Sequence, residues 1–307
     1  MVSTAQDTAI STPKGPNPNK AVFGGKNALG KNHQQSILNV LRMACADALK
    51  QPDFVLRLQE IKRRFYERDF DGIFLASANL PVYTAQYVPR RALCYYEVFT
   101  SPEMQKILHS HPQIYCLGAG SGSELVGISA ACCNALSGPD MHIKANPIIV
   151  HSQDYTNWEP ILDSLASAIR YKWNLSNEHI EYKFSIGDLL HISSDIEQQI
   201  SSADLVTAMF VFNELFADKA NAMNFVKTIV KFLRPGAHFL LVDSAGSFSR
   251  IKVGNKNYMS YMFFDSLTQV FEPIVSDNFR WFRHAAGLDY PLSIENMRYF
   301  IRLYRRK

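Results

Sequence analysis

Ile114-Tyr115-Cys116-Leu117-Gly118-Ala119-Gly120-Ser121-Gly122-Ser123-Glu124 is an apolar run that continues into a glycine-rich turn and then into a predicted helix. This succession is typical of the first β-α unit of an open α/β sheet. Gly118, Gly120 and Gly122 let the backbone pass close to a ligand, where a side chain would collide with it. A tight β-α turn without a ligand would use the same glycines, so the turn alone leaves ligand binding open.

The chain after residue 111 alternates short apolar runs with amphipathic stretches, as β-α units around a parallel sheet do. We predict strands near 113–117, 147–151, 180–186, 204–210 and 237–242, and helices near 122–135, 158–171, 194–200 and 216–233. A helix near 258–270 and strands near 279–283 and 297–304 complete the pattern. We therefore expect an α/β fold over residues 111–307, with a seven-stranded, mostly parallel, Rossmann-like sheet.

Two segments precede this domain. Residues 1–35 contain three prolines, four glycines and few large apolar residues, which predicts a disordered tail. Residues 36–110 carry apolar residues at helical spacing, so we expect a helical N-terminal extension near the ligand site. Its basic side chains are either a solvated helix face or an RNA contact; they are Arg57, Lys62, Arg63, Arg64 and Arg68.

The composition excludes several classes of protein. The 307 residues carry a net charge of +4, which suits a polyanionic partner without requiring one. No apolar run approaches the roughly 18 residues of a membrane-spanning helix, and we find no secretory signal, so we expect a soluble, intracellular protein that is not secreted. The five cysteines form no C-x-x-C pair and the nine histidines show no ligand spacing, which predicts neither disulfides nor a metal.

Polar residues follow three more of the predicted strands, at the sheet edge where α/β proteins place their ligands. Asp154, followed by Tyr155, can accept hydrogen bonds from two ribose hydroxyls. Gly187-Asp188 can accept from an exocyclic amine, although Asp188 could instead cap the next helix. Asn213-Glu214 stand inside an apolar stretch, where uncompensated burial is costly, so they are either a helix N-cap or ligand-facing groups.

The order of these features, together with Leu233-Arg234-Pro235-Gly236 before an apolar strand that ends at Asp243, resembles the class I S-adenosylmethionine-dependent methyltransferases. The resemblance covers about residues 111–307 and implies that S-adenosylmethionine is the cofactor, held by Gly118, Gly120, Gly122, Glu124, Asp154, Tyr155, Gly187 and Asp188. A nicotinamide dehydrogenase has a wider glycine spacing. Cys116 departs from the pattern, because many methyltransferases have an acidic residue two places before the first glycine.

A narrower resemblance includes the N-terminal region. The segments Tyr87–Tyr96, Cys116–Glu124, Phe212–Phe216 and Asp243–Ser247 are similar to those of the fungal large-subunit (25S) ribosomal RNA uridine-N3 methyltransferases. The resemblance implies ribosomal RNA or a pre-ribosomal particle as the partner, in the nucleus or nucleolus, with the cytoplasm as the alternative.

For the reaction at uridine N3 we expect Glu214 to be the base and Asn213 to hold a uracil carbonyl. We expect Arg90 and Arg91 to contact the RNA, although Arg91 could instead hold the N-terminal region against the catalytic domain. Two other interpretations remain at this stage: a class I methyltransferase acting on protein or a small molecule, and an inactive methyltransferase-like binding subunit, to which Cys116 lends weight. The sequence leaves the oligomeric state open.

Overall fold

The computed structural model describes residues 28–135, 146–246, 250–253 and 255–307. Of the predicted disordered tail, residues 1–27 lie outside the described residues. Residues 28–35 already belong to the folded part, because Leu29 is 3% exposed and helix α1 begins at His33. Asn32 caps this helix by accepting a hydrogen bond from the backbone N–H of Gln35 at 3.0 Å.

The centre of the fold is a seven-stranded sheet, as predicted, and its strand order is β3-β2-β1-β4-β5-β9-β8. Strands β1 to β5 are parallel, and β9 is antiparallel to both of its neighbours. The five parallel strands are Gln113–Leu117 (β1), Ile148–Asp154 (β2), Ile180–Ile186 (β3), Leu205–Met209 (β4) and His238–Ser244 (β5). The remaining two are Phe271–Phe282 (β8) and Met297–Arg306 (β9).

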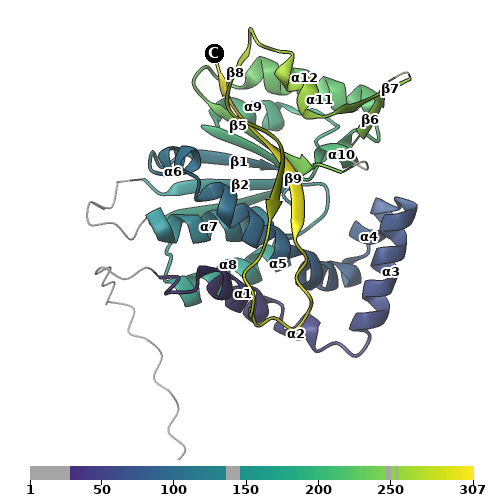
Figure 1. Cartoon of the computed structure of the whole chain (residues 1–307), viewed down its shortest axis with the longest axis vertical. Coiled ribbons are helices and arrows are strands. Elements are labelled where there is room, and N and C mark those ends of the chain that lie inside the picture. The colour runs from purple at the N-terminus through teal and green to yellow at the C-terminus, as the bar shows by residue number, and fades with distance from the viewer. Residues whose placement is uncertain (1–27, 136–145, 247–249, 254) are drawn as a thin grey trace, which may run out of the picture.

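Alternate residues of the central strands β1, β4, β5 and β9 supply two separate cores, because successive side chains of a strand point to opposite faces. Ile114 and Cys116 of β1 belong to the first core, and Tyr115 and Leu117 to the second. Figure 1 shows the two helical layers. On the first face lie α1 (His33–Ala44), α5 (Leu80–Phe99), α7 (Ser123–Ala135) and α8 (Glu159–Trp173), and on the second α9 (Ser194–Ser202), α11 (Lys219–Phe232) and α12 (Tyr261–Asp265).

The N-terminal helices are part of the first core. Besides α1 and α5, they comprise α2 (Ala46–Leu49), α3 (Phe54–Glu67), α4 (Phe70–Phe74), the 3₁₀ turn η1 (Ser77–Asn79) and α6 (Pro102–Leu108). Helix α5 is the most deeply placed: Val88, Ala92 and Leu93 are fully buried. It packs against α7, where Gly127 faces the backbone and Cβ of Tyr95 and Tyr96. The predicted helical region therefore shares its hydrophobic core with the sheet.

The prediction for residues 258–270 was wrong. Tyr258 belongs to strand β7 (Lys256–Met259), which pairs with β6 (Arg250–Val253) in a two-stranded hairpin, and the helix that follows, α12, has five residues. Strand β8 then starts at Phe271, eight residues before the predicted start at 279. Two register shifts interrupt its pairing with β9 and break the alternating pattern by which strands are recognised.

The segment between β8 and β9 returns to the N-terminal helices. The backbone carbonyl of Asp289 accepts from Arg42 at 2.5 Å and from Gln35 at 3.0 Å, and the hydroxyl of Tyr290 donates to the carbonyl of Ala85 at 3.0 Å. These contacts link the last strand pair to α1 and α5. Among the described helices, none combines the length and the apolar character needed to cross a membrane.

The close approach of α5 and α7 yields a stability prediction. A Cβ at position 127 would lie 2.8 Å from the Cβ of Tyr95 and 3.2 Å from the backbone nitrogen of Tyr96. Gly127→Ala should therefore lower the free energy of unfolding by about 1–3 kcal/mol in denaturant titrations, because α5 must shift away. Helix propensity alone would raise stability by about 1 kcal/mol, so a stabilised variant would contradict the close contact between α5 and α7.

Candidate active site

Two adjoining cavities lie at the carboxyl ends of β1, β2 and β4, where the strand order reverses, the usual ligand position in open α/β sheets. Both are lined by Gly118, Asp154, Tyr155 and Glu214. The first extends inward towards α5. The second has a volume of about 390 Å³ and is lined on one side by the turn between α3 and α4. This volume is that of a small-molecule site.

The three glycines of the β1–α7 turn have positive φ angles, +56° at Gly118, +53° at Gly120 and +85° at Gly122. A Cβ at Gly118 would lie 2.3 Å from Val211, and one at Gly122 would lie 2.8 Å from Leu162. At Gly120 a Cβ would meet nothing within 4 Å, and this residue lines the first cavity. Two of the glycines therefore permit close packing, and Gly120 leaves the space that a ligand can approach.

Asp154 connects the glycine turn to the end of β2. Its Oδ2 accepts from the backbone N–H of Gly120 at 3.0 Å, and its Oδ1 accepts from Thr156 at 2.9 Å. Burial raises the pKa of Asp154, and these backbone hydrogen bonds oppose the shift. A carboxylate offers about four acceptor positions, so two remain for a ligand. Tyr155 is 37% exposed at the rim, where its ring stands edge-on to Phe74.

Gly187 and Asp188 lie at the end of β3. The side-chain amide of Gln153 donates to the carbonyl of Gly187 at 3.2 Å, and a Cβ on Gly187 would lie 2.6 Å from the same nitrogen. Asp188 lines the second cavity and accepts from the backbone of Leu190 at 2.9 Å. It does not cap the following helix, because Ser193 occupies the N-cap of α9.

Glu124, in the first turn of α7, is fully buried in the wall of the first cavity. It accepts a short hydrogen bond from the hydroxyl of Thr207 on β4. Burial raises the pKa of Glu124 to about 7. Thr207 also approaches the thiol of Cys116, so the carboxyl group of Glu124 stands beside the position where an acidic residue was missing. Glu124 was expected as a cofactor contact, but its place beside Cys116 could not be predicted from the sequence.

Asn213 and Glu214 belong to the short helix α10 (Phe212–Leu215) after β4. Asn213 is not a helix N-cap; its amide donates to Oδ1 of Asp243, the penultimate residue of β5, at 3.2 Å. Glu214 lines both cavities. Burial, with Asp154 and Asp243 adding to the effect and Arg91 opposing it, raises the pKa of Glu214 to about 7. Phe210, just before α10, has φ of +60°, a strained conformation typical of functional sites.

Arg90 and Arg91, neighbours on α5, lie in different surroundings. Arg91 lines the first cavity, donates to the hydroxyl of Tyr83 at 2.8 Å and lies 5.7 Å from the ring of Phe210. Arg90 pairs with Glu295 and lies 5.2 Å from the ring of Tyr87. The position of Arg91 in the cavity was not recognisable from the sequence, because its partners come from distant segments.

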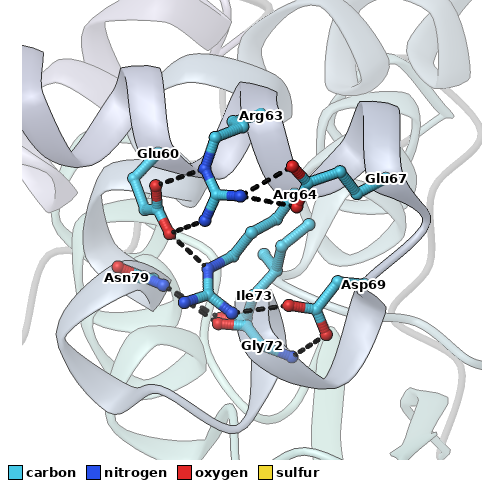
Figure 2. Close-up of polar contacts among 8 residues, drawn as sticks. All are labelled: Glu60, Arg63, Arg64, Glu67, Asp69, Gly72, Ile73 and Asn79. Carbon is cyan, nitrogen blue, oxygen red and sulfur yellow. Dashed lines mark hydrogen bonds and ion pairs between the residues drawn. The ribbon is translucent and has the colours of Figure 1, made fainter.

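The basic face of α3 is largely neutralised by its own acidic neighbours (Figure 2). Glu60 accepts from both Arg63 and Arg64 at 2.7 Å, and Arg64 continues to Asp69 at 2.6 Å. Asp69 in turn accepts from the backbone of Gly72 in α4 at 3.0 Å. The network fixes the turn between α3 and α4, and residues 68–71, which form this turn and the start of α4, line the second cavity. Its main effect is thus to shape the cavity wall.

Within the described ranges, no group of three or more His, Cys, Asp or Glu side chains is arranged to hold a metal ion. A family model described as "Putative SAM-dependent methyltransferase" matches residues 41–305. Among curated proteins, the chain is similar to the 25S rRNA (uridine(2843)-N(3))-methyltransferase of Saccharomyces cerevisiae, with 27% identity over 280 residues, which are 81% of this chain and 77% of the yeast protein.

Two solved structures are also similar. One is the N-methyltransferase NodS from Bradyrhizobium japonicum in complex with S-adenosyl-l-homocysteine, with 13% identity, coverage of 81% of this chain and 98% of that chain, and a TM-score of 0.42. The other is magnesium protoporphyrin IX methyltransferase from Synechocystis with bound SAM, with 11% identity, coverage of 72% and 84%, and a TM-score of 0.41. The family match confirms the expected cofactor, S-adenosylmethionine.

Replacing Gly120 with alanine tests whether the cofactor lies against the glycine turn, and the same replacement at Gly236 is the matched control. Both have positive φ and open space around a Cβ, but Gly236 lies before β5, at the opposite edge of the sheet. Each Gly→Ala variant should lose about 1–2 kcal/mol of stability through backbone strain. Only Gly120→Ala should bind S-adenosylhomocysteine more weakly, by tenfold or more in calorimetry. Equal affinities in the two variants would show that the turn is structural only.

Proposed function

Because the chain belongs to the S-adenosylmethionine-dependent methyltransferase family whose model matches residues 41–305, we propose that it methylates N3 of a uridine in large-subunit ribosomal RNA. The observation that carries the reaction is the partly buried carboxyl group of Glu214, which lines both cavities and stands beside Asn213. The similarity to the yeast enzyme, whose name states this reaction, supports a uridine of ribosomal RNA as the methyl acceptor. The same similarity supports a place in the nucleus or nucleolus.

The residues at the ends of β2 and β3 fit the adenosine part of the cofactor. Asp154 retains acceptor positions for the two ribose hydroxyls after its bonds to Gly120 and Thr156. Asp188 can accept from the adenine amine at the side of the second cavity. Gly120 offers a backbone surface without a side chain beside them. These positions support the cofactor contacts expected from the sequence.

The first cavity, which extends inward towards α5, fits the amino-acid end of the cofactor. This end carries one ammonium and one carboxylate group. The carboxyl group of Glu124 can accept from the ammonium, and it replaces the acidic residue that Cys116 does not provide. The guanidinium of Arg91 can pair with the carboxylate, because among the described residues it forms no direct ion pair. We therefore assign Arg91 to the cofactor in place of RNA, and Arg90 remains a candidate RNA contact.

This assignment of Arg91 predicts a difference between two ligands. Arg91→Met should weaken S-adenosylhomocysteine binding by about 10- to 150-fold, the usual worth of a hydrogen bond to a charged group. Binding of 5′-methylthioadenosine, which lacks the amino-acid end, should be unchanged. Calorimetry with both ligands measures the difference, and Arg90→Met is the control for loss of a neighbouring arginine. Equal weakening of both ligands would assign Arg91 a structural role instead.

The side chains around Glu214 fit proton removal from uridine N3, which is protonated at neutral pH. When bound, the cofactor supplies a methyl group on a positively charged sulfur, which a nitrogen lone pair in line with it can take. The carboxylate of Glu214 would take the N3 proton as the lone pair becomes available. The amide of Asn213, held by Asp243, would donate to a uracil carbonyl and stabilise the charge that develops there. Phe74, Tyr83 and Trp158 exclude water from the inner wall.

Glu214 also predicts the pH dependence of the reaction. A general base acts in its deprotonated form, and the pKa of Glu214 is about 7. The single-turnover rate should therefore rise between about pH 6 and pH 8 with an inflection near 7. Glu214→Gln, which keeps the shape but cannot take a proton, should lower the rate by about 10²–10⁴-fold and remove the inflection.

Nucleoside mass spectrometry of ribosomal RNA, treated with each variant and S-adenosylmethionine, measures the product. S-adenosylhomocysteine affinity serves as the control for an intact site. A Glu214→Gln variant that keeps both the rate and the inflection would exclude this residue as the base. An intact protein that binds the cofactor but forms no N3-methyluridine would favour a protein or small-molecule acceptor.

A further inference from the structure

The last part of strand β8 exposes two aromatic side chains. Phe279 is 58% exposed and Trp281 is 53% exposed, whereas Phe282, the next residue, is fully buried. Arg298 on β9 is the cross-strand partner of Trp281, and its guanidinium lies 5.3 Å from the ring of Phe279. Arg283 follows β8 directly and is also exposed. We call the group Phe279, Trp281, Arg283 and Arg298 the β8–β9 surface.

The β8–β9 surface adjoins the edge of the sheet that carries the active site. Phe300 of β9 pairs with Asp243, the residue that holds Asn213. Arg298 lies two residues before Phe300 in β9, which is about 7 Å along the strand. Its carbonyl accepts from the backbone of Ala245, just after β5, at 3.4 Å. A polynucleotide whose target base reaches Asn213 and Glu214 would therefore pass close to this surface.

The charge of the surface is uncompensated, unlike that of α3. Neither Arg283 nor Arg298 takes part in any ion pair within the described part of the chain, whereas Arg280 pairs with Asp277 at 2.8 Å. Exposed aromatic rings beside free arginines are the arrangement that holds single-stranded nucleic acid, with bases stacked on the rings and phosphates on the cations. RNA is read mainly through such unpaired, stacked bases.

We propose that the β8–β9 surface binds the single-stranded RNA next to the target nucleotide, with bases stacked on Phe279 and Trp281 and phosphates bound by Arg283 and Arg298. The proposal rests on the proposed function, because it takes RNA as the substrate. Strand β8 is also an edge strand, to which a strand of another protein could add. Its two register shifts, at Pro273/Val275 and Asp277/Arg280, disfavour that occupant, because an irregular edge pairs poorly.

The tryptophans provide a direct readout. The sequence has three, and Trp158 and Trp173 are each 1% exposed, so acrylamide quenching of the intrinsic fluorescence reports mainly on Trp281. Adding an oligouridine of about 12 nucleotides to the full-length protein should protect this fluorescence from acrylamide. Trp281→Ala should lower the affinity for the oligouridine by about 5- to 150-fold, the worth of one stacked base. Trp281→Phe should restore most of it.

Arg298→Gln tests the phosphate contacts. It should reduce the slope of log affinity against log salt by about 0.7, the contribution of one phosphate of a single strand. Tyr66→Ala is the matched control, because Tyr66 is an aromatic residue 92% exposed on α3, away from β8. It should leave RNA binding unchanged, and all variants should keep the wild-type affinity for S-adenosylhomocysteine.

Distinct results separate this proposal from the proposed function. If the intact protein binds RNA and methylates it, but Trp281→Ala binds equally well or the quenching does not change, the β8–β9 surface is wrong and the proposed function stands. If an RNA duplex protects Trp281 as well as the oligouridine does, the single-strand assignment is wrong. If the intact protein binds neither RNA, both proposals fail.

Discussion

Four carboxyl groups converge at the carboxyl ends of β1, β2, β4 and β5, three of them close enough to the guanidinium of Arg91 to interact with it, and the rest of the site depends on this electrostatic constraint. The residues are Glu124, Asp154, Glu214 and Asp243, and burial raises the pKa of each. Arg91 opposes the shift at Glu124, Glu214 and Asp243. The surplus of acidic groups suits a ligand with a net positive charge, and S-adenosylmethionine carries two positive groups and one negative group. The pKa of Glu214 near 7 also suits a base that works at neutral pH.

Helix α5 connects this constraint to the fold. Its buried face belongs to the core that also covers the sheet, and the same helix carries Tyr83 and Arg91 into the cavity wall. The glycine at position 127 of α7 allows the two helices to approach, which places Arg91 opposite Glu214. The family model matches from residue 41, inside α1, so the matched region includes the N-terminal helices that follow α1 as well as the sheet. A displacement of α5 would therefore change both stability and cofactor binding.

The arginines of the chain fall into groups with different surroundings. Arg63 and Arg64 are paired with carboxylates that shape the cavity wall, and Arg91 is inside the cavity. Arg298 stands beside an exposed aromatic ring. A net charge of +4 says little about where a polyanion would bind, because most of the basic residues on α3 are compensated locally. Only the arrangement of the neighbouring carboxylates distinguishes a structural arginine from one available to RNA.

Sequence patterns alone predict the sheet, the glycine turn and the acidic residues at the strand ends. These features depend on local patterns: an apolar run before Gly118 predicts β1, Asp154 is the last residue of β2, and Asp188 lies two residues after the end of β3. The sequence failed at residues 258–270, where a short apolar run fits a helix as well as the hairpin and five-residue helix that form. Three relations follow from the packing of the chain and not from local sequence: Glu124 stands beside Cys116, Arg91 faces the cavity while Arg90 pairs with Glu295, and Trp281 lies close to the active edge. Each of these relations joins segments far apart in the chain, and it is the packing of α5 on α7 and the register of β9 against β5 and β8 that bring them together.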